Sequence, residues 1–324
     1  MGNLVEERKR LLVKVSKLYY VDGLNQQEIA ERLRISRPNV SRMLSEARSE
    51  GIVTITIKNP YEEEQQLERA IAETFGIHDV IVHNISDNDP KLIERQLALA
   101  GAALLETTLK DRDIVGVMAG RATASLGREA EYFPRKGLQF VPLVGGWGIE
   151  RADWHANTNA RVLGETFKSK YWQLNAPAVV SSKETRDALL NEPEIQEVLG
   201  LARQSTVALL GIGQLSEQAT IVKSGYLKAE ELRSIEESGA VANLCASFLN
   251  DRGEILELPV SARMIGVTLP ELRRQAQVIG IASGEDKVAA ITATLRGKWI
   301  DVLVTDYRTA KAILEWNRTH PVES

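Results

Sequence analysis

The chain has 324 residues, of which 44% are hydrophobic and 26% charged, and its formal net charge is −4. This length and composition exclude a single small domain and a disordered or low-complexity chain, and the sequence contains neither the roughly 18-residue apolar run of a membrane helix nor a signal peptide. The single cysteine, Cys245, excludes an internal disulfide and a multi-cysteine zinc site. We therefore expect a soluble, cytoplasmic protein without a metal, a cofactor or a membrane partner.

The charge is distributed unevenly along the chain. Residues 1–60 hold 11 Lys/Arg and 7 Asp/Glu, a net charge of +4, whereas residues 61–324 carry a net charge of −8. A basic head on an acidic body indicates two different functions. The basic end is suited to an anionic polymer such as a nucleic acid.

Apolar residues at helical spacing predict three helices in the basic part, over residues 5–20, 25–33 and 37–50. Ser36 is a suitable N-cap for the third helix. Pro38 is tolerated in its first turn, because the missing N–H has no intrahelical partner there. The second and third helices are joined by a three-residue turn, which predicts a helix-turn-helix.

In a helix-turn-helix, the second helix of the motif enters the major groove of DNA. Arginine reads guanine and asparagine reads adenine at the base edges, while other polar side chains contact phosphates. Residues 52–57 alternate between apolar and polar side chains, which predicts a strand that would form a small wing. The residues expected to contact DNA are Gln26, Gln27, Ser36, Arg37, Pro38, Asn39, Ser41 and Arg42. The alternative is a three-helix bundle whose charges are merely solvated.

The break at Asn59-Pro60 is followed by a different pattern. Residues 62–75 are first acidic and then amphipathic, which suits a linker helix. We divide the chain into a DNA-binding domain, residues 1–58, a linker helix, residues 59–76, and an effector-binding and oligomerisation domain, residues 77–324.

Short apolar runs alternate with helical stretches after residue 76. The expected strands are 80–82, 114–117, 140–143, 207–210, 278–281 and 302–304, and the expected helices are 91–109, 122–131, 159–168, 287–296 and 308–316. This alternation predicts an α/β domain with a largely parallel sheet that is covered on both faces.

Ligands of open parallel sheets bind at the carboxyl ends of the strands, where helix N-termini point at anions. Arg121 can grip a phosphate with two hydrogen bonds, Thr123 adds a hydroxyl, and Lys287 is a candidate partner for an anion or a hydroxyl. Any one glycine-rich loop is more often a simple turn than a ligand site. The candidates in these loops are Gly120, Arg121, Thr123, Gly145, Gly146, Gly211, Gly213 and Lys287.

The chain resembles the SorC family of bacterial transcriptional regulators. The similar stretches are LNQQEIAERL (24–33) with ISRPNVSRML (35–44), DIVGV (113–117) with GRA (120–122), PLVGG (142–146), VALLGIG (207–213), GAV (239–241), and Lys287 with LVTD (303–306). These stretches cover nearly the whole chain and stand in the family's order.

This resemblance implies a winged helix-turn-helix followed by a Rossmann-like α/β effector domain that is similar to sugar-phosphate isomerases and deaminases. It also implies a homo-oligomer, typically a tetramer, that binds operator DNA of sugar catabolic operons and responds to sugars or phosphorylated sugars. Gly120 and Arg121 match the family's first effector loop and Gly145 and Gly146 its second. Asn157 matches the asparagine after that loop.

The chain departs from the family pattern at three positions. Val144 stands where some relatives carry Lys or Arg, Ala119 replaces a Trp, and Asn243 replaces an acidic residue. The smaller cationic charge favours a monophosphate, an uncharged sugar or a polyol over a bisphosphate, and Asn243 joins the candidate effector-binding residues.

Two other functions were considered for the body. An isomerase- or deaminase-like enzyme fused to a DNA-binding domain needs a general base, and of the four histidines only His155 lies in a candidate loop. A dinucleotide-binding module needs a third glycine where Ser216 stands. We therefore predict a non-enzymatic, DNA-binding regulator of a carbohydrate catabolic operon, controlled by a sugar, polyol or sugar phosphate.

Overall fold

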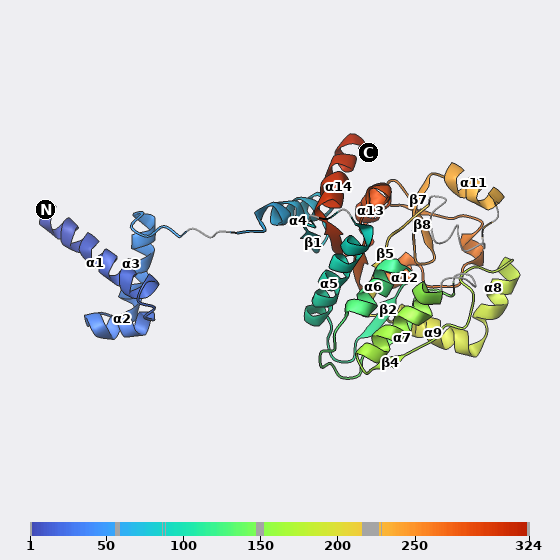
Figure 1. Cartoon of the computed structure of the whole chain (residues 1–324), viewed down its shortest axis with the longest axis horizontal. Helices are drawn as coiled ribbons and strands as arrows, with labels where there is room; N and C mark the ends of the chain where they lie inside the picture. The colour runs from blue at the N-terminus through green and yellow to red at the C-terminus, as the bar shows by residue number, and fades with distance from the viewer. Residues whose placement is uncertain are drawn as a thin grey trace. The chain divides into compact units, whose positions relative to one another are not determined.

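The computed structural model describes residues 2–55, 59–85, 87, 89–146, 152–215, 227 and 229–322 (Figure 1). The chain divides into two compact units, residues 1–60 and residues 61–324. No helix in the described part of the chain combines the length and the apolarity that crossing a membrane requires.

The first unit is built from α1 (Gly2–Tyr20), α2 (Gln26–Leu33) and α3 (Arg37–Ser49). Their apolar faces meet in one core, in which the largest fully buried side chains belong to α1 and α2. The fully buried residues of this core are Leu12, Val15, Ile29, Val40 and Ala47. The predicted helices and their inward faces are thus confirmed.

Capping interactions fix both ends of α2 and the start of α3. Asn25 forms a capping box at the start of α2, where its Oδ1 accepts hydrogen bonds from the N–H groups of Gln27 at 2.9 Å and Glu28 at 3.0 Å. Arg34 ends α2 in the left-handed region with φ 54°. Ser36 Oγ then accepts from the N–H of Asn39 at 3.4 Å, which confirms Ser36 as the N-cap of α3.

Residues 52–55, which the alternating pattern assigns to a strand, form no strand, and residues 56–58 lie outside the described residues. Ile52 and Val53 instead pack against the helical core, and the N–H of Val53 donates to Ala47 O at 3.0 Å. A strand must pair its backbone groups with a neighbouring strand. The described residues of this unit form only helices, turns and irregular segments, so the prediction of a strand is wrong for residues 52–55.

The second unit contains a seven-stranded sheet in the order β1-β11-β10-β5-β2-β3-β4, and every pair of neighbours is parallel. Its strands are β1 (Asp79–His83), β2 (Ile114–Val117), β3 (Gln139–Pro142), β4 (Lys170–Tyr171), β5 (Val207–Gly211), β10 (Gln277–Ile281) and β11 (Val302–Asp306). Strands that are covered on both faces read as continuous apolar runs, which is why the sequence indicated a parallel sheet.

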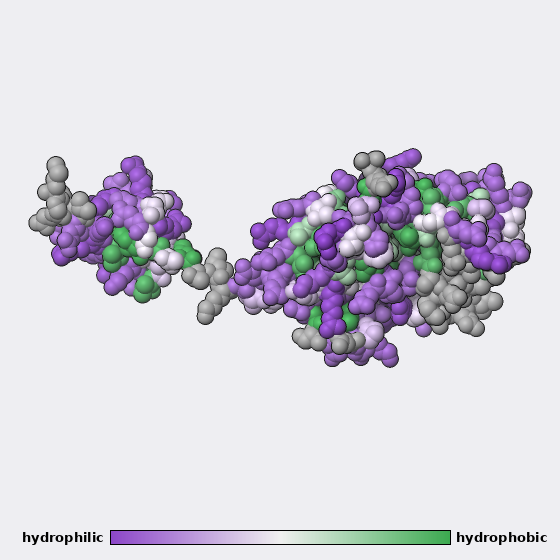
Figure 2. All heavy atoms as spheres, turned by 90° about the horizontal axis from the view of Figure 1, so that it is seen from above, coloured by the Kyte–Doolittle hydropathy of each residue, from purple (hydrophilic) through white to green (hydrophobic). Residues whose placement is uncertain are grey.

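Helices cover both faces of this sheet. On one face α5 (Pro90–Thr108), α6 (Arg121–Glu129) and α7 (Ala156–Thr166) pack on a cluster that contains Val117, Phe140 and Leu209. The other face carries α4 (Glu62–Phe75), α9 (Pro193–Arg203), α13 (Val288–Arg296) and α14 (Tyr307–Thr319), packed on a larger cluster. The remaining helical segments are η1 (Ala152–Trp154), α8 (Lys183–Leu190), α11 (Ala229–Glu237), η2 (Ser261–Arg263), α12 (Leu269–Leu272) and η3 (Glu285–Lys287). Hydrophilic residues cover most of the visible face of this unit (Figure 2).

A second, antiparallel sheet is inserted between β5 and β10. It consists of β6 (Gly213–Gln214), β7 (Ala240–Leu244), β8 (Ser247–Asn250) and β9 (Ile255–Leu256), in that order. Its apolar side packs with α13, and Phe248 is fully buried there. The sequence pattern did not indicate this sheet, because β6 and β9 have two residues each, and β7 (AVANL) and β8 (SFLN) are neither continuous apolar runs nor clear alternations.

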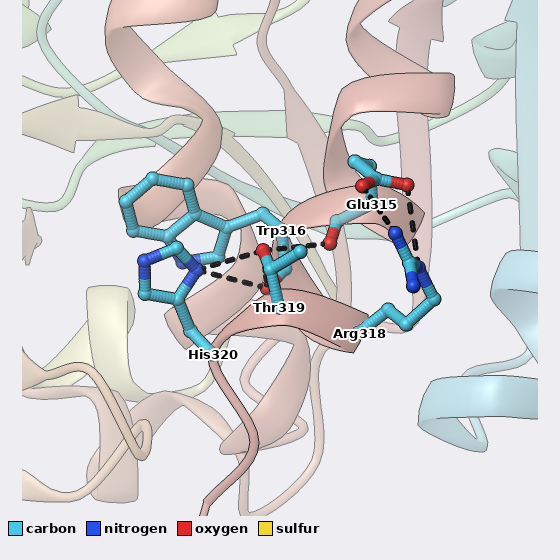
Figure 3. Close-up of polar contacts among 5 residues, drawn as sticks. All are labelled: Glu315, Trp316, Arg318, Thr319 and His320. Carbon is cyan, nitrogen blue, oxygen red and sulfur yellow. Dashed lines mark hydrogen bonds and ion pairs between the residues drawn. The ribbon is translucent and has the colours of Figure 1, made fainter.

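The helix at residues 62–75, expected as a linker, packs on β1 and α14 within the second unit. The last turn of α14 is fastened by its own side chains (Figure 3). The His320 ring stacks on Trp316 with a centroid distance of 3.8 Å, and Arg318 pairs with Glu315 at 2.6 Å. Arg296 Nε donates to Asn317 Oδ1 at 3.0 Å, which joins this end of α14 to the end of α13.

Candidate functional site

The order of the strands creates a switch point in the middle of the large sheet. From β2 the chain proceeds outward through β3 to β4, whereas from β5 it proceeds in the opposite direction through β10 to β11. Ligands of open α/β sheets bind in the crevice outside the carboxyl ends of the strands at such a point. The segments that follow β2, β10 and β11 meet here with the N-terminal half of α5, around a cavity of about 320 Å³.

Arg121 and Lys287 both line this cavity. Arg121 is the first residue of α6 and is exposed, and its guanidinium lies 5.7 Å from the centroid of the Trp154 ring. Lys287 ends η3 and is half-buried. Burial lowers the pKa of the Lys287 ammonium below its usual value, and the charge of Arg121 lowers it further, against the opposing charges of Asp286 and Glu94. Two adjacent cations, one of them poorly hydrated, favour an anion between them.

The loop after β2 is held by buried polar groups. Thr123 is fully buried, and its hydroxyl lies 2.9 Å from Met118 O and 3.0 Å from Gly120 O. Asn159 on α7 donates from Nδ2 to Thr123 Oγ1 at 2.9 Å. Gly120 has φ +133°, a conformation that favours glycine, and its N–H donates to Trp154 O at 2.8 Å. Thr123 and Asn159 thus hold the loop that carries Arg121. Thr123 itself is not among the residues that line the cavity.

The turn after β11 forms the other wall. The buried carboxylate of Asp306 is the N-cap of α14 and accepts from the N–H groups of Arg308 at 2.9 Å and Thr309 at 3.0 Å. Thr309 Oγ1 donates to Asp306 Oδ2 at 2.5 Å and accepts from the N–H of Gly284 at 2.9 Å. The loops after β10 and β11 are therefore one connected structure, and both line the cavity.

Carboxylates line the cavity in addition to the cations. Glu94, Glu285, Asp286 and Asp306 line it together with the cations Arg121, Lys287 and Arg308. Gln214 on β6 donates to Asp286 Oδ2 at 2.8 Å and so ties the small sheet to the cavity wall. Glu94, Arg308 and Thr309 are not among the residues predicted from the sequence. The sequence holds one signal for the turn between β11 and α14. An aspartate ends an apolar strand there and stands three residues before a threonine, a pattern that is typical of a helix N-cap.

The glycines of the second predicted loop lie against another segment of backbone. Gly146 N–H donates to Ala176 O at 2.9 Å, and a Cβ on Gly145 would lie 2.5 Å from that oxygen. Asn157 donates to Leu174 O at 3.1 Å and accepts from the N–H of Leu174 at 2.8 Å. Gly145, Gly146 and Asn157 are not among the residues that line the cavity. Their expected contact with an effector stays a prediction.

The remaining predicted effector-binding residues, Gly211, Gly213 and Asn243, lie in different parts of the fold. Gly211 ends β5, and a Cβ there would lie 3.8 Å from the Cβ of Ala122, beside the Arg121 loop. Gly213 pairs with Asn243 between β6 and β7, where the buried Asn243 donates to Ser247 O at 3.0 Å. Gly211, Gly213 and Asn243 are not among the residues that line the cavity. The fold thus brings Arg121 and Lys287 together in the cavity and places Gly120 directly before Arg121.

The predicted DNA contacts gather at the start of α2 and in the first turns of α3. Arg37, Asn39, Ser41 and Arg42 are all exposed on α3, whereas Val40 between them is buried. The other predicted contacts are Gln26, which is half-buried, Gln27, which donates to Glu31 Oε1 at 2.9 Å, Ser36, which caps α3, and Pro38, which is exposed.

Farther along α3, Arg8 of α1 pairs with Glu46, and the hydrogen bond from Arg8 lowers the pKa of that carboxyl. The exposed first turns of α3 carry Arg37, Asn39 and Arg42 and no acidic residue. Such a surface suits the edges of bases in a groove.

Comparisons with known proteins cover both units. Residues 22–54 match the family described as "Winged helix-turn-helix DNA-binding", and residues 59–315 match the family described as "Putative sugar-binding domain". The chain is 30% identical to a deoxyribonucleoside regulator from Bacillus subtilis (strain 168), over 95% of this chain and 98% of the relative. It is 29% identical to a sorbitol operon regulator from Klebsiella pneumoniae, over 94% and 98% of the two chains.

A solved structure extends this similarity to the fold of the whole chain. The full-length sorbitol operon regulator SorC from Klebsiella pneumoniae matches with a TM-score of 0.75 at 28% identity, over 94% of this chain and 98% of that chain. The helix-turn-helix and the α/β body therefore occur together in a known protein in the same order.

Proposed function

The chain belongs to the SorC family of DNA-binding transcriptional regulators with a sugar-binding domain, and from this membership we propose how its two units work. The first unit binds operator DNA of a carbohydrate catabolic operon through Arg37, Asn39, Ser41 and Arg42 on α3. The second unit binds a sugar, polyol or sugar phosphate in the cavity lined by Arg121 and Lys287.

The observation that carries this proposal is the meeting of Arg121 and Lys287 at the switch point of the sheet. Their paired charges suit the phosphate of a phosphorylated effector. Carboxylates on the other walls, such as Glu94, are acceptors for sugar hydroxyls. The two relatives described above are named as a sorbitol operon regulator and a deoxyribonucleoside regulator, which supports a polyol or sugar-derived effector here.

A fused isomerase- or deaminase-like enzyme is the weaker candidate, because a regulator accounts for both units of the chain. We propose that the protein acts in the cytoplasm as a homo-oligomer. A symmetric dimer or tetramer would place paired recognition helices on a palindromic or repeated operator. Effector binding would favour one arrangement of the subunits, so that DNA and effector change each other's affinity by equal factors.

The test is a reciprocal pair of variants in the full chain. We expect phosphorylated sugars or polyols to raise the melting temperature of the wild-type protein, because a ligand that binds only the folded state stabilises it. Arg121→Ala should lose this shift and keep specific DNA binding. Arg37→Ala should keep the shift and lose discrimination between the selected operator and scrambled DNA, by roughly one to three kcal/mol per lost base contact.

Each variant is the folding control for the other. A shift produced only by unphosphorylated sugars would overturn the phosphate assignment and leave the regulator assignment in place. An intact effector response in Arg121→Ala would remove Arg121 from the site, and an unchanged sequence preference in Arg37→Ala would remove it from the groove.

A further inference from the structure

Tyr307 stands beside the effector cavity, at the turn between β11 and α14. Its neighbours Asp306 and Arg308 line the cavity, whereas its ring packs against the hydrophobic cluster on the α4 and α14 side of the sheet. The Tyr307 hydroxyl donates a 2.7 Å hydrogen bond to Glu63 Oε2 in the first turn of α4. One residue therefore connects the wall of the cavity with the helix that follows the DNA-binding unit.

The two ends of α4 are held differently. Ile71 and Phe75 are buried near its C-terminal end, and Glu68 Oε1 accepts from the N–H of Val82 on β1 at 2.9 Å. In the first turn, Glu64 is buried, and the exposed carboxylate of Glu63 accepts the hydrogen bond from Tyr307. This turn follows directly after residue 60, where the first unit ends. The connection to the DNA-binding unit therefore begins at this turn. A displacement of the first turn of α4 would displace the start of that connection.

The first turn of α14 is equally well connected to the effector loops. Thr309 accepts from the N–H of Gly284 and donates to Asp306, so a displacement of the loop that carries Lys287 acts on residues 306–309. At the far end of α14, Trp316 and His320 stack (Figure 3). Arg296 also donates a hydrogen bond to Asn317 there. The turn that carries Tyr307 is therefore the part of α14 that is hydrogen-bonded to the loops of the cavity.

Resting on the function proposed above, we propose that the hydrogen bond between Tyr307 and Glu63 couples effector occupancy to DNA binding. In one state of the protein the bond holds the first turn of α4 against α14, and in the other state the bond is broken. A ligand shifts such an equilibrium only through its different affinity for the two states. One charge-assisted hydrogen bond is enough to change the coupling by roughly three- to tenfold.

The experiment measures DNA affinity of the full chain with and without effector. The DNA is a duplex selected by the wild-type chain from a random library, and the effector probe is a millimolar pool of hexose phosphates, pentose phosphates, sorbitol and erythritol. The coupling factor is the ratio of the two DNA affinities. Tyr307→Phe, which removes only the hydroxyl, should reduce this factor by roughly three- to tenfold, while the melting-temperature shift caused by the pool is retained.

Three further variants separate coupling from general damage. Glu63→Gln keeps an acceptor and should retain most of the coupling, whereas Glu63→Ala should lose as much as Tyr307→Phe. The double variant Glu63→Ala/Tyr307→Phe should lose no more than either single variant, because both remove the same bond. Tyr132→Phe makes the same chemical change at an exposed tyrosine beside Lys168 and should leave the coupling factor unchanged.

The outcomes distinguish the two proposals. If the wild-type chain responds to the pool and Tyr307→Phe responds by the same factor, the coupling role is overturned and the proposed function stands. If the wild-type chain binds DNA and ignores the pool, the effector half of the proposed function fails and the coupling role fails with it. A loss in the double variant that equals the sum of the two single losses would also contradict the coupling bond.

Discussion

Lys287 illustrates how a neighbouring charge and partial burial set the properties of one residue. In the cavity, burial and Arg121 both disfavour the charged ammonium and lower its pKa. A phosphate placed between the two cations would favour the charged form again. Lys287 should therefore take up a proton when an anionic effector binds at a pH above the lowered pKa.

We predict that affinity for a sugar phosphate falls as the pH rises through the lowered pKa of Lys287. The protonated form binds the anion better, so affinity is highest below this pKa and declines by up to about tenfold per pH unit, until the higher pKa of the bound state is passed. Isothermal titration calorimetry of the wild-type chain between about pH 7.5 and 10 measures this dependence, in a range where the phosphate itself, with a second pKa of about 6, stays fully ionised.

The matched control is Lys287→Arg, whose charge persists throughout this range. It should bind the same ligand with an affinity that no longer follows pH. A wild-type affinity that depends on pH no more than that of Lys287→Arg would show that Lys287 does not contact the anion.

At the scale of the element, the same residue type serves different purposes in different loops. Gly120 has a positive φ and open space around it, which suits the approach of a ligand or a backbone turn. Gly145 lies against a second stretch of backbone, where a Cβ would be 2.5 Å from both Ala176 O and the carbonyl carbon of Pro177. The sequence shows only a glycine after a strand in both cases.

We predict that Gly145→Ala lowers the free energy of unfolding by roughly 1–3 kcal/mol, because neither backbone can yield without disturbing the loop. The control is Gly200→Ala on α9, where a new Cβ meets nothing within 4 Å. That variant should raise stability by about 0.5–1 kcal/mol through helix propensity. Urea unfolding of the full chain, followed by circular dichroism, compares the two midpoints.

The same pair of variants separates packing from ligand contact at the second loop. If Gly145 serves only the approach of an effector, Gly145→Ala would unfold at the wild-type urea concentration and lose effector binding alone. If Gly145 serves packing, Gly145→Ala should have a lower midpoint of urea unfolding and proportionally weaker effector binding.

For the whole molecule, the separation of charge between a basic head and an acidic body has a measurable consequence. Binding to DNA releases counterions from neutralised phosphates, so affinity depends steeply on salt. We predict that a complex contacting about six phosphates loses roughly a thousandfold in DNA affinity between 50 and 200 mM salt. Fluorescence anisotropy with a labelled duplex over a salt series gives the slope directly.

Variants that remove one charge test which residues produce the salt dependence of DNA affinity. Arg42→Gln on α3 should reduce the steepness of the salt dependence, whereas Glu194→Gln, an exposed position on α9 of the acidic body, should leave it unchanged. Equal slopes in the wild-type chain and in Arg42→Gln would indicate that Arg42 does not contact a phosphate.

The predictions that rest on local patterns agree best with the structure. The three N-terminal helices, the Ser36 cap and the parallel strands are confirmed, because helical period, capping side chains and apolar runs act within a few residues of one another. The strand at residues 52–57 shows the limit of this reasoning. Alternation was present there, but residues 52–55 pack on the helical core and form no strand.

The composition of the cavity was decided by the tertiary structure. Arg121 and Lys287 could be selected from sequence, because each lies in a loop between a strand and a helix. That Glu94, Arg308 and Thr309 share their cavity depends on which loops meet at the switch point of the sheet. The sequence by itself thus determined the two units, their order and the chemistry of the loops, since these depend on local period and charge. Only the packing of distant segments decided that Thr123 and Asn157 bond to backbone or loop neighbours outside the cavity lining, and that Tyr307 joins the cavity wall to α4.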